Sequence, residues 1–377
     1  MSFTSCPDFS ELEHDLILDF SECLQENIEE IEVVIALLDR SYGHDLVNRL
    51  FRDVHSLKGN CRMVFLDPLV DTIHALEEIV SDMRDKKVLY TPLHGEFILA
   101  IVMRINQMII GLITDGKVDG KPHELMLEVI LNVHKSDTSK EVVTLNQALD
   151  DLAGNRQSIK PESRPEAHTD AKDDKAEIKK SETEIHPDLV FFKQLALQLD
   201  EISIYKRGRT QAIFDLCHST NNNMGSIVDS DQLSAAIYLH DLGMSLVPSG
   251  ILNKPGKLAK EEFQLIKNHI EMGSQILARI PGWEEAASMV RHHHEKYDGT
   301  GYPDSLCRDD IHPGAMIIAL ADTFYAVTNE RADRSYKKSL FSAVTLINGQ
   351  SGLQFNPTFV EAFNDTIRRH YISPKSA

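Results

Sequence analysis

Apolar residues recur at steps of three and four along most of the chain, and this spacing decides what the chain can fold into. It is clearest over residues 15–39, DLILDFSECLQENIEEIEVVIALLD, and returns over residues 45–64, 68–85 and 95–114. Short connections join these segments, and the two-residue alternation that marks strands is absent. We therefore predict an all-α protein that begins with an up-down helical bundle.

A charged segment over residues 154–184 interrupts this pattern, since it has no aromatic residue and is rich in Lys, Glu, Ser and Pro. Such a segment cannot bury enough apolar surface to offset the entropy lost on ordering. We predict a flexible linker over residues 138–185, in which residues 141–153 have the spacing of one short amphipathic helix. The linker would join a first domain, residues 1–137, to a second all-helical bundle, residues 186–377.

Composition narrows the choice of partner and compartment. A length of 377 residues fits two domains, and a net charge of −19 argues against nucleic acid or an anionic membrane as a partner. The five cysteines are scattered, as expected for reduced thiols. The longest apolar stretch, residues 97–113, contains Arg104, Asn106 and Gln107 and fits a buried helix better than a membrane span. The sequence opens without a signal peptide, so we expect a cytoplasmic protein.

The first chemical motif is HSLKGN at residues 55–60. His55 and Lys58 share a helix face, and Gly59 leaves the surface beside the ring bare. In the next predicted helix His74 and Glu77 are again three apart. If the two helices are antiparallel neighbours, a carboxylate orients one nitrogen of an exposed imidazole, beside a cation for an incoming phosphoryl group. A surface His beside a surface Lys explains the first pair equally well, but the second pair favours chemistry.

These residues resemble the histidine phosphotransfer (Hpt) family, especially the domain found in chemotaxis-type kinases, over residues 10–135. The resemblance implies that His55 carries the phosphoryl group. It assigns the supporting positions to Lys58, His74 and Glu77. One position departs from the family, because Arg62 stands where a small residue is usual, and this changes which receiver domain can approach. No ATP-binding domain follows in the sequence, so the expected partner is a receiver domain of a response regulator or hybrid histidine kinase, or a kinase acting in trans.

The second half contains a set of potential metal ligands, all imidazoles or carboxylates: His240, Asp241, His269, His293, His294 and Asp322. They fall on four predicted helices, one of them over residues 260–280, and suit iron, manganese or zinc. Taken alone, HHH at 292–294 fits a solvated helix end, and His269 fits a structural histidine. Asp322 is different, because it lies in the apolar run MIIALADTFYAV, where a carboxylate needs a metal or an arginine as partner.

The combination resembles the HD-GYP family, a branch of the HD phosphohydrolases that degrades cyclic di-GMP, over residues 190–370. HDLG (240–243) matches the His-Asp motif of the family. HHEKYDGTGYPDSL (293–306) matches the signature that names the branch, and ADTFYAV (321–327) supplies the last aspartate. The resemblance implies an all-helical HD-domain bundle with a two-metal phosphodiesterase site.

The resemblance also points to substrate-binding residues. Tyr302 belongs to the signature loop. RSYKK (334–338) is similar to a basic segment that binds phosphate in the family. It follows an apparent three-residue insertion, so Arg331 and Arg334 compete for the phosphate-binding role.

Two positions depart from the HD-GYP pattern. In YKRGRTQAI (205–213), Arg209 stands at the position of the first metal-ligating histidine, and Arg cannot ligate a metal. Met244 replaces the lysine of H-D-x-G-K. We expect the guanidinium to occupy the space of one metal and to pair with Asp241 or Asp322.

The family's two metal centres are therefore affected unequally. One centre, with His240, Asp241 and Asp322, has lost its fourth ligand. The other retains its full set, which is Asp241, His269, His293 and His294. We expect at most one divalent metal ion, iron, manganese or zinc, and hydrolysis that is lost or strongly reduced.

Three functions are consistent with the sequence. The favoured one is a bacterial phosphorelay signalling protein in which His55 transfers a phosphoryl group and a degenerate HD-GYP domain acts as a regulatory module for cyclic di-GMP or for an enzyme of its metabolism. The second is an active metal-dependent cyclic di-GMP phosphodiesterase controlled by the Hpt domain. The third is a non-catalytic scaffold.

Overall fold

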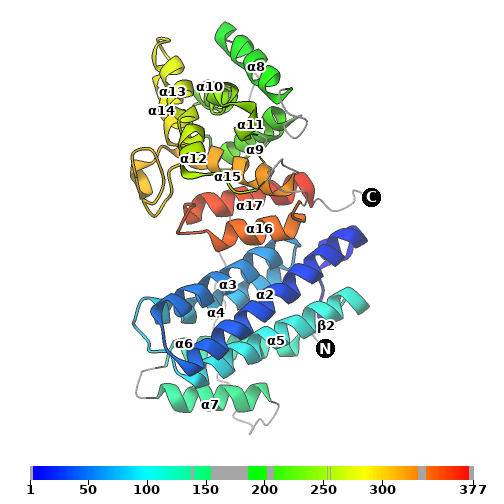
Figure 1. Cartoon of the computed structure of the whole chain (residues 1–377). Coiled ribbons are helices and arrows are strands. Elements are labelled where there is room, and N and C mark those ends of the chain that lie inside the picture. The colour runs from blue at the N-terminus through cyan, green and yellow to red at the C-terminus, as the bar shows by residue number, and fades with distance from the viewer. Residues whose placement is uncertain are drawn as a thin grey trace.

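The computed structural model shows an elongated, almost entirely helical molecule (Figure 1). It describes residues 3–136, 140–153, 186–201, 208–252, 254, 256–329 and 337–372. Within these ranges the named strands are a single two-residue pair, β1 (Phe3–Thr4) antiparallel to β2 (Val118–Asp119). The all-α prediction is confirmed.

The first half is a bundle built from long helices. Its elements are α1 (Pro7–Ser10), α2 (His14–Arg40), α3 (His44–Met63), α4 (Asp67–Arg84), α5 (Pro92–Asp115), α6 (Lys121–His134) and α7 (Glu141–Leu152). The four predicted segments correspond to α2, α3, α4 and α5. Local signals fix their ends: α5 begins at a capping box between Thr91 and His94 and ends at Gly116, whose φ of 67° is left-handed.

Helix α5 is long and apolar enough to cross a membrane by length and composition, with a mean hydropathy of 1.9 over its most apolar window. In this structure it is a bundle helix. One face, including Phe97, Ile101 and Ile105, is buried against α2 and α7. The core of a helical bundle requires the same composition as a span, so this helix is explained by the fold it lies in.

The short helix predicted over residues 141–153 is observed as α7, and it packs on α5 and α6. It buries Leu145, Ala148 and Leu152, and Glu141 pairs with His94 Nε2 at 3.1 Å. Helix α7 therefore packs as part of the first bundle. The rest of the predicted linker, residues 154–185, lies outside the described residues.

The second half is a compact set of shorter helices. Its α-helices are α8 (Pro187–Asp200), α9 (Arg209–Asn223), α10 (Ser230–Leu239), α11 (Ser249–Leu252), α12 (Lys260–Lys267), α13 (His269–Ala278), α14 (Glu284–His292), α15 (Pro313–Thr328), α16 (Leu340–Gly349) and α17 (Pro357–Tyr371). Two 3-10 helices, η2 (Leu242–Leu246) and η3 (Arg308–Asp310), complete it. Helix α15 is central, since it packs on α9, α14, α16 and α17.

The helix predicted over residues 260–280 is divided in two. Helix α12 ends at Lys267 and α13 begins at His269, with Asn268 between them. Helix α12 carries no fully buried residue, whereas α13 packs closely on α14 and η2. The apolar spacing continues across this break, so periodicity alone did not reveal it.

The two halves are in direct contact. Helices α16 and α17 lie between the remainder of the second half and the first bundle, with α16 packed on α2 and α3 (Figure 1). The rings of Phe20 and Phe341 meet edge to face at the boundary, with centroids 5.6 Å apart. The sequence predicted a flexible linker and showed no contact between the domains, and the structure adds a packed interface.

Candidate functional site

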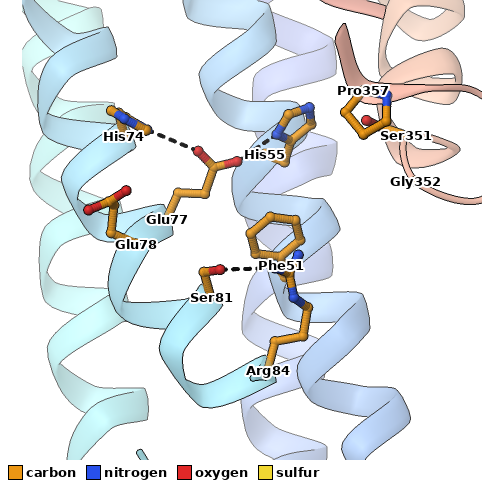
Figure 2. Close-up of a pocket in the computed structure, with 10 residues that line it drawn as sticks. All are labelled: Phe51, His55, His74, Glu77, Glu78, Ser81, Arg84, Ser351, Gly352 and Pro357. Carbon is orange, nitrogen blue, oxygen red and sulfur yellow. Dashed lines mark hydrogen bonds and ion pairs between the residues drawn. The ribbon is translucent and has the colours of Figure 1, made fainter. Parts of the chain in front are cut away.

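The His55 motif and the H-x-x-E motif meet across α3 and α4, as the spacing predicted. Nδ1 of His55 donates to Oε1 of Glu77 at 2.5 Å, and Lys58 Nζ donates to the other carboxylate oxygen at 2.5 Å. His74 Nδ1 reaches the same oxygen at 3.2 Å. Figure 2 shows Glu77 lying between the two imidazoles. The Glu77 carboxylate is therefore hydrogen-bonded to both imidazoles and to the lysine.

Glu77 is held ionised by these contacts. Burial alone would raise the pKa of its carboxyl, but the hydrogen bonds from His55 and Lys58 outweigh burial and lower that pKa to about 2. Because a carboxylate only accepts, the His55 proton lies on Nδ1, which leaves the Nε2 lone pair available. The arrangement defines one nucleophilic nitrogen.

His55 is less accessible than the sequence suggested. Its side chain is 13% exposed, against 59% for His74. A pocket of about 240 Å³ adjoins the ring and is lined both by the first bundle and by Ser351, Gly352 and Pro357 from the second half (Figure 2). The segment between α16 and α17 thus faces the candidate phosphorylation site.

In the second half, Arg209 lies at the start of α9 and is 8% exposed. Its Nη1 is 2.9 Å from Asp241 Oδ2, and its Nη2 is 2.6 Å from Asp322 Oδ1. The pairing expected from the sequence with one of these aspartates is observed with both. The guanidinium therefore bridges the His-Asp motif and helix α15.

The same guanidinium also donates a hydrogen bond to a ring nitrogen of His240. Nδ1 of His240 donates to the carbonyl of Ile237 at 2.7 Å, so Nε2 is the acceptor for Arg209 Nη2 at 3.1 Å. Burial lowers the pKa of His240 and keeps the ring neutral. The ring nitrogen that would ligate a metal therefore accepts a hydrogen bond from Arg209 instead. The arginine stays charged because its guanidinium does not deprotonate in proteins.

Electrostatics keep this cluster charged. Burial opposes the positive charge of Arg209, but Asp241 and Asp322 raise its pKa above the ordinary value. Burial likewise opposes the charge of Asp322, and Arg209 lowers the pKa of that carboxyl. One cation between two carboxylates leaves the cluster with a net negative charge, which suits one further cation.

Three imidazoles form a separate group beside this cluster. The ligand atoms of His269, His293 and His294 lie within 4.8 Å of one another. His269 and His293 donate Nδ1 to the carbonyls of Ile266 and Val290, so each turns Nε2 inward. Among the described residues His293 Nε2 has no hydrogen-bond partner.

The state of these rings fits a divalent metal. Burial lowers the pKa of His293 well below its usual value and that of His294 to about 4, so both are neutral near pH 7. Asp241 Oδ1 lies 3.5 Å from His269 Nε2 and supplies a carboxylate. These residues fit one ion, whereas the place beside Arg209 does not fit a second.

A close backbone approach positions the His-Asp motif against His269. A Cβ atom at Gly243 would overlap the backbone carbonyl of His269. Only glycine allows η2 to lie this close to the first turn of α13. The glycine of HDLG thus brings Asp241 and His269 to one centre.

The signature loop closes the pocket from the other side. The Tyr302 ring stacks on His294 with centroids 5.1 Å apart, and Lys267 Nζ lies 4.5 Å above the tyrosine ring. Burial raises the pKa of Tyr302, which keeps its hydroxyl protonated. Tyr302 therefore combines an aromatic face, a hydroxyl and an adjacent cation.

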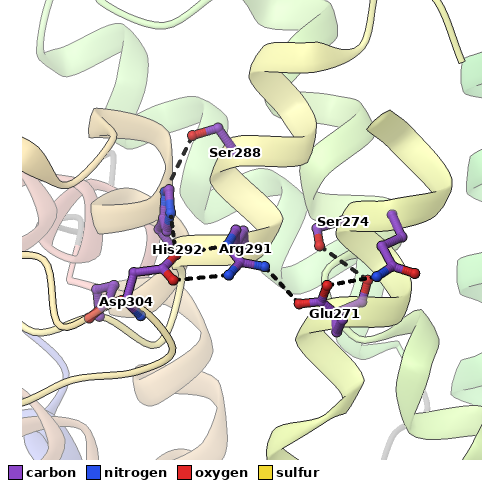
Figure 3. Close-up of polar contacts among 8 residues, drawn as sticks. Glu271, Ser274, Ser288, Arg291, His292 and Asp304 are labelled. Atoms are coloured by element: carbon purple, nitrogen blue, oxygen red, sulfur yellow. Dashed lines mark hydrogen bonds and ion pairs between the residues drawn. The ribbon is translucent and has the colours of Figure 1, made fainter. Parts of the chain in front are cut away.

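An ion-pair network fastens this loop to α13 and α14. Arg291 donates to both carboxylate oxygens of Asp304, at 2.7 and 2.9 Å, and to Glu271 at 2.6 Å (Figure 3). His292 also contacts Asp304, at 3.3 Å. Sequence reasoning missed the Arg291–Asp304 pair, because no spacing rule links a helix residue to a loop residue in this way.

Comparison with known proteins identifies both halves. Residues 15–111 match the Hpt domain model, and residues 200–359 match the HD domain model. The chain joins an Hpt domain to an HD domain. A cyclic di-GMP phosphodiesterase of Thermotoga maritima is 38% identical over 134 residues, 35% of this chain and 36% of that protein. The 3'3'-cGAMP-specific phosphodiesterase 2 of Vibrio cholerae is 38% identical over 137 residues, 35% of this chain and 26% of that protein.

The chain spans between about a quarter and about a third of the length of these relatives. Among solved structures, a HDG"Y"P protein from Bdellovibrio bacteriovorus is 12% identical, with 78% of this chain and 80% of that chain covered and a TM-score of 0.35.

The remaining predicted residues of the HD domain fall in different places. Arg331 and Arg334 lie outside the described residues. Met244 lies within η2, one turn after Asp241. His292, the first of the three consecutive histidines, interacts with Ser288 and Asp304 and is absent from the imidazole group.

Proposed function

We propose that this chain is a signalling protein in which His55 accepts and returns a phosphoryl group, while the HD domain is a regulatory module with at most one metal ion and little or no hydrolysis. The observation that carries the HD part is the contact of Arg209 with both Asp241 and Asp322. A fixed monovalent cation holds carboxylates in place, but it cannot activate water as a metal does.

For the Hpt domain, the geometry supports Nε2 of His55 as the nucleophile. It would attack the phosphorus of an aspartyl phosphate on another protein, forming the P–N bond as the P–O bond breaks and the aspartate leaves as a carboxylate. Glu77 holds the Nδ1 proton and stabilises the positive charge that develops on the ring. The partner class is therefore a receiver domain.

For the HD domain, the free imidazole nitrogens support a single metal site. His269, His293 and His294, with Asp241, would hold iron, manganese or zinc. Such an ion would polarise a phosphate oxygen of a bound nucleotide. Tyr302 and Lys267 flank the position where a base and a phosphate would lie, and the relatives support cyclic di-GMP or a related cyclic dinucleotide as the ligand class. We propose a cytoplasmic location for the protein.

A second function is favoured by a specific observation, the complete imidazole group and its Asp241 neighbour. If one metal suffices for hydrolysis, the HD domain is an active cyclic di-GMP phosphodiesterase regulated by the Hpt domain. The two functions predict opposite results in one assay.

The assay measures metal content, cyclic di-GMP binding and cyclic di-GMP turnover on the purified full chain reconstituted with iron or manganese. We expect at most one equivalent of metal and turnover reduced by on the order of a thousandfold relative to a two-metal HD-GYP enzyme assayed in parallel. Two bound equivalents with rapid turnover would establish the active enzyme instead.

The phosphotransfer part is tested separately with phosphoramidate, a small phosphoryl donor, and His55→Gln as the control. We expect acid-labile label on His55 and none in the variant. Label that persists in His55→Gln would place the modification elsewhere.

A further inference from the structure

The HD domain covers the face of α3 that carries His55. Helices α16 and α17 contact α3 directly, and residues between and along them line the spaces on both sides of the His55 ring. On one side these are Ser351, Gly352 and Pro357 (Figure 2). On the other side they are Glu361 and Asn364, in a pocket of about 190 Å³.

Gly59, one turn beyond His55, is part of this contact. A Cβ atom at Gly59 would overlap the side-chain amide of Asn348 on α16. Asn348 is fully buried there and accepts a hydrogen bond from Asn364 of α17 at 2.8 Å. The bare surface beside the histidine is therefore filled by the chain's own HD domain.

Arg62, two turns beyond His55, points to the same partner. Its Nη2 lies 3.4 Å from Asp365 of α17. A second arginine reaches across the interface from the HD domain. Arg368 of α17 lies 3.9 Å above the Phe65 ring and 3.7 Å from Asp67, both in the Hpt domain. The departure of Arg62 from the Hpt pattern is explained by a contact within the chain.

This interface is packed but incompletely hydrogen-bonded. In the described part of the chain, Asn60 Oδ1, Asn348 Nδ2 and Asn364 Oδ1 are buried without a hydrogen-bond partner. Buried polar atoms without partners regain hydrogen bonds with water when the surfaces separate. The interface is therefore suited to opening.

We propose that α16 and α17 form an internal cover over His55, so that access to Nε2 depends on separation of the HD domain from the Hpt domain. The proposal rests on the phosphoryl-accepting role of His55 proposed above. A protein that carries an aspartyl phosphate must bring its phosphorus to bonding distance of Nε2. It therefore competes with α16 and α17 for the same face of α3.

Phosphorylation would then oppose closure. The phosphoryl group adds roughly two negative charges at His55. Glu361 of α17 lines the pocket on one side of the ring, beside Lys58 and Arg62 of the Hpt domain, and Gly352 and Pro357 line the space on the other. Closure of the same cover would place the phosphoryl group beside the Glu361 carboxylate and in the space held by Gly352 and Pro357, so the HD domain is released when His55 is loaded.

Thr345 of α16 allows the cover to be locked or opened at one position. Its Oγ1 is 2.9 Å from Cys23 Sγ on α2 and 2.8 Å from Asn60 Nδ2 on α3. Thr345→Cys brings a second thiol to Cys23 and permits a disulfide across the interface. Thr345→Glu places a carboxylate in a buried contact where burial, with Asp19 and Glu26, already raises the pKa of the Cys23 thiol, and so drives the surfaces apart. Thr345→Ser is the matched control.

The readout is the rate of carbethoxylation of His55 by diethyl pyrocarbonate, measured by peptide mass spectrometry and divided by the rate at the exposed His74. We expect Thr345→Glu to raise this ratio about fivefold and the oxidised Thr345→Cys protein to lower it about fivefold, with reduction restoring it. Thr345→Ser should match the wild type. If Thr345→Cys does not oxidise, Thr345→Glu alone decides the question.

Equal carbethoxylation ratios in the wild type, the oxidised Thr345→Cys protein and Thr345→Glu would overturn the proposal that α16 and α17 cover His55. A different result is expected if the cover exists but His55 does not accept a phosphoryl group. The carbethoxylation ratio then still falls in the oxidised Thr345→Cys protein and rises in Thr345→Glu, but phosphoramidate labels His55 in none of the forms. Labelling that is slowest in the oxidised form and fastest in Thr345→Glu supports both proposals.

Discussion

At the scale of single residues, Arg209 changes what the HD pocket can do. It forms an ion pair with Asp322, a carboxylate in an apolar segment that needs a partner. It also forms an ion pair with Asp241 and donates a hydrogen bond to His240. Removing one partner from such a buried cluster exposes the others to an uncompensated charge. The residue thus stabilises the fold where a metal would otherwise bind.

Replacing Arg209 with methionine tests this stabilising role. We expect Arg209→Met to lower the free energy of unfolding by about 3–5 kcal/mol in metal-free buffer, because the buried carboxylate of Asp241 and the partly buried carboxylate of Asp322 lose their cation. Urea titration with and without manganese checks it. Manganese should recover part of the loss in the variant and change the wild type less. No loss in metal-free buffer would contradict the pairing.

Restoring the pattern of the HD-GYP family tests the catalytic role. We expect Arg209→His combined with Met244→Lys to bind one more equivalent of metal than the wild type and to gain turnover of cyclic di-GMP. The gain should be on the order of a hundredfold or more if a second metal supplies charge stabilisation. Either substitution alone is the control. Equal turnover in the wild type and the double variant would mean that Arg209 does not limit hydrolysis.

Glu77 makes stability depend on pH in the acid range. Its pKa in the folded chain is about 2, below the ordinary value of 4.5, so its contribution is fully present above about pH 5 and is lost as pH falls toward 2. We expect Glu77→Gln to be less stable than the wild type by on the order of 3 kcal/mol at pH 6. The gap should narrow by pH 3. Urea unfolding at pH 6, 4 and 3 measures it, and a constant gap would contradict the ion cluster.

At the scale of elements, periodicity predicted α2 to α5 and α7, because each needs one apolar stripe to bury. It missed the break at Asn268, where the apolar spacing continues although one helix ends and the next begins. It also missed the partner of α3, since an apolar stripe reports burial and does not say against which surface. Motif spacing brought His55 to Glu77, and charge brought Arg209 to its aspartates. The Arg291–Asp304 pair depends on loop geometry, which leaves no periodic trace.

The approach of η2 to α13 yields a prediction at this scale. We expect Gly243→Ala to cost about 1–3 kcal/mol and to weaken metal binding, because the new methyl group meets the backbone of His269. Gly250→Ala is the matched control, since a Cβ there meets nothing within 4 Å. Thermal unfolding and metal titration of both variants measure the difference. Equal behaviour would mean that the close approach is not required.

At the scale of the whole molecule, the contact of Phe20 with Phe341 joins two cores into one. Both rings are fully buried. We expect Phe341→Ala to lower the free energy of unfolding by about 3–5 kcal/mol and to separate a calorimetric transition of the Hpt half from that of the HD half. Phe263→Ala is the control, because that ring is 46% exposed on α12. A single unshifted transition in Phe341→Ala would show that the halves do not stabilise each other.

Because of Arg209, the two sides of the HD pocket would respond differently when metal ions are scarce. A chelator can strip an ion from imidazoles, but it cannot remove an arginine that is part of the chain. When iron or manganese is scarce, the side of the pocket around α9 and α15 would keep its shape, and only the three-histidine side would be left empty. A domain built this way would keep its fold under conditions that disassemble a two-ion centre.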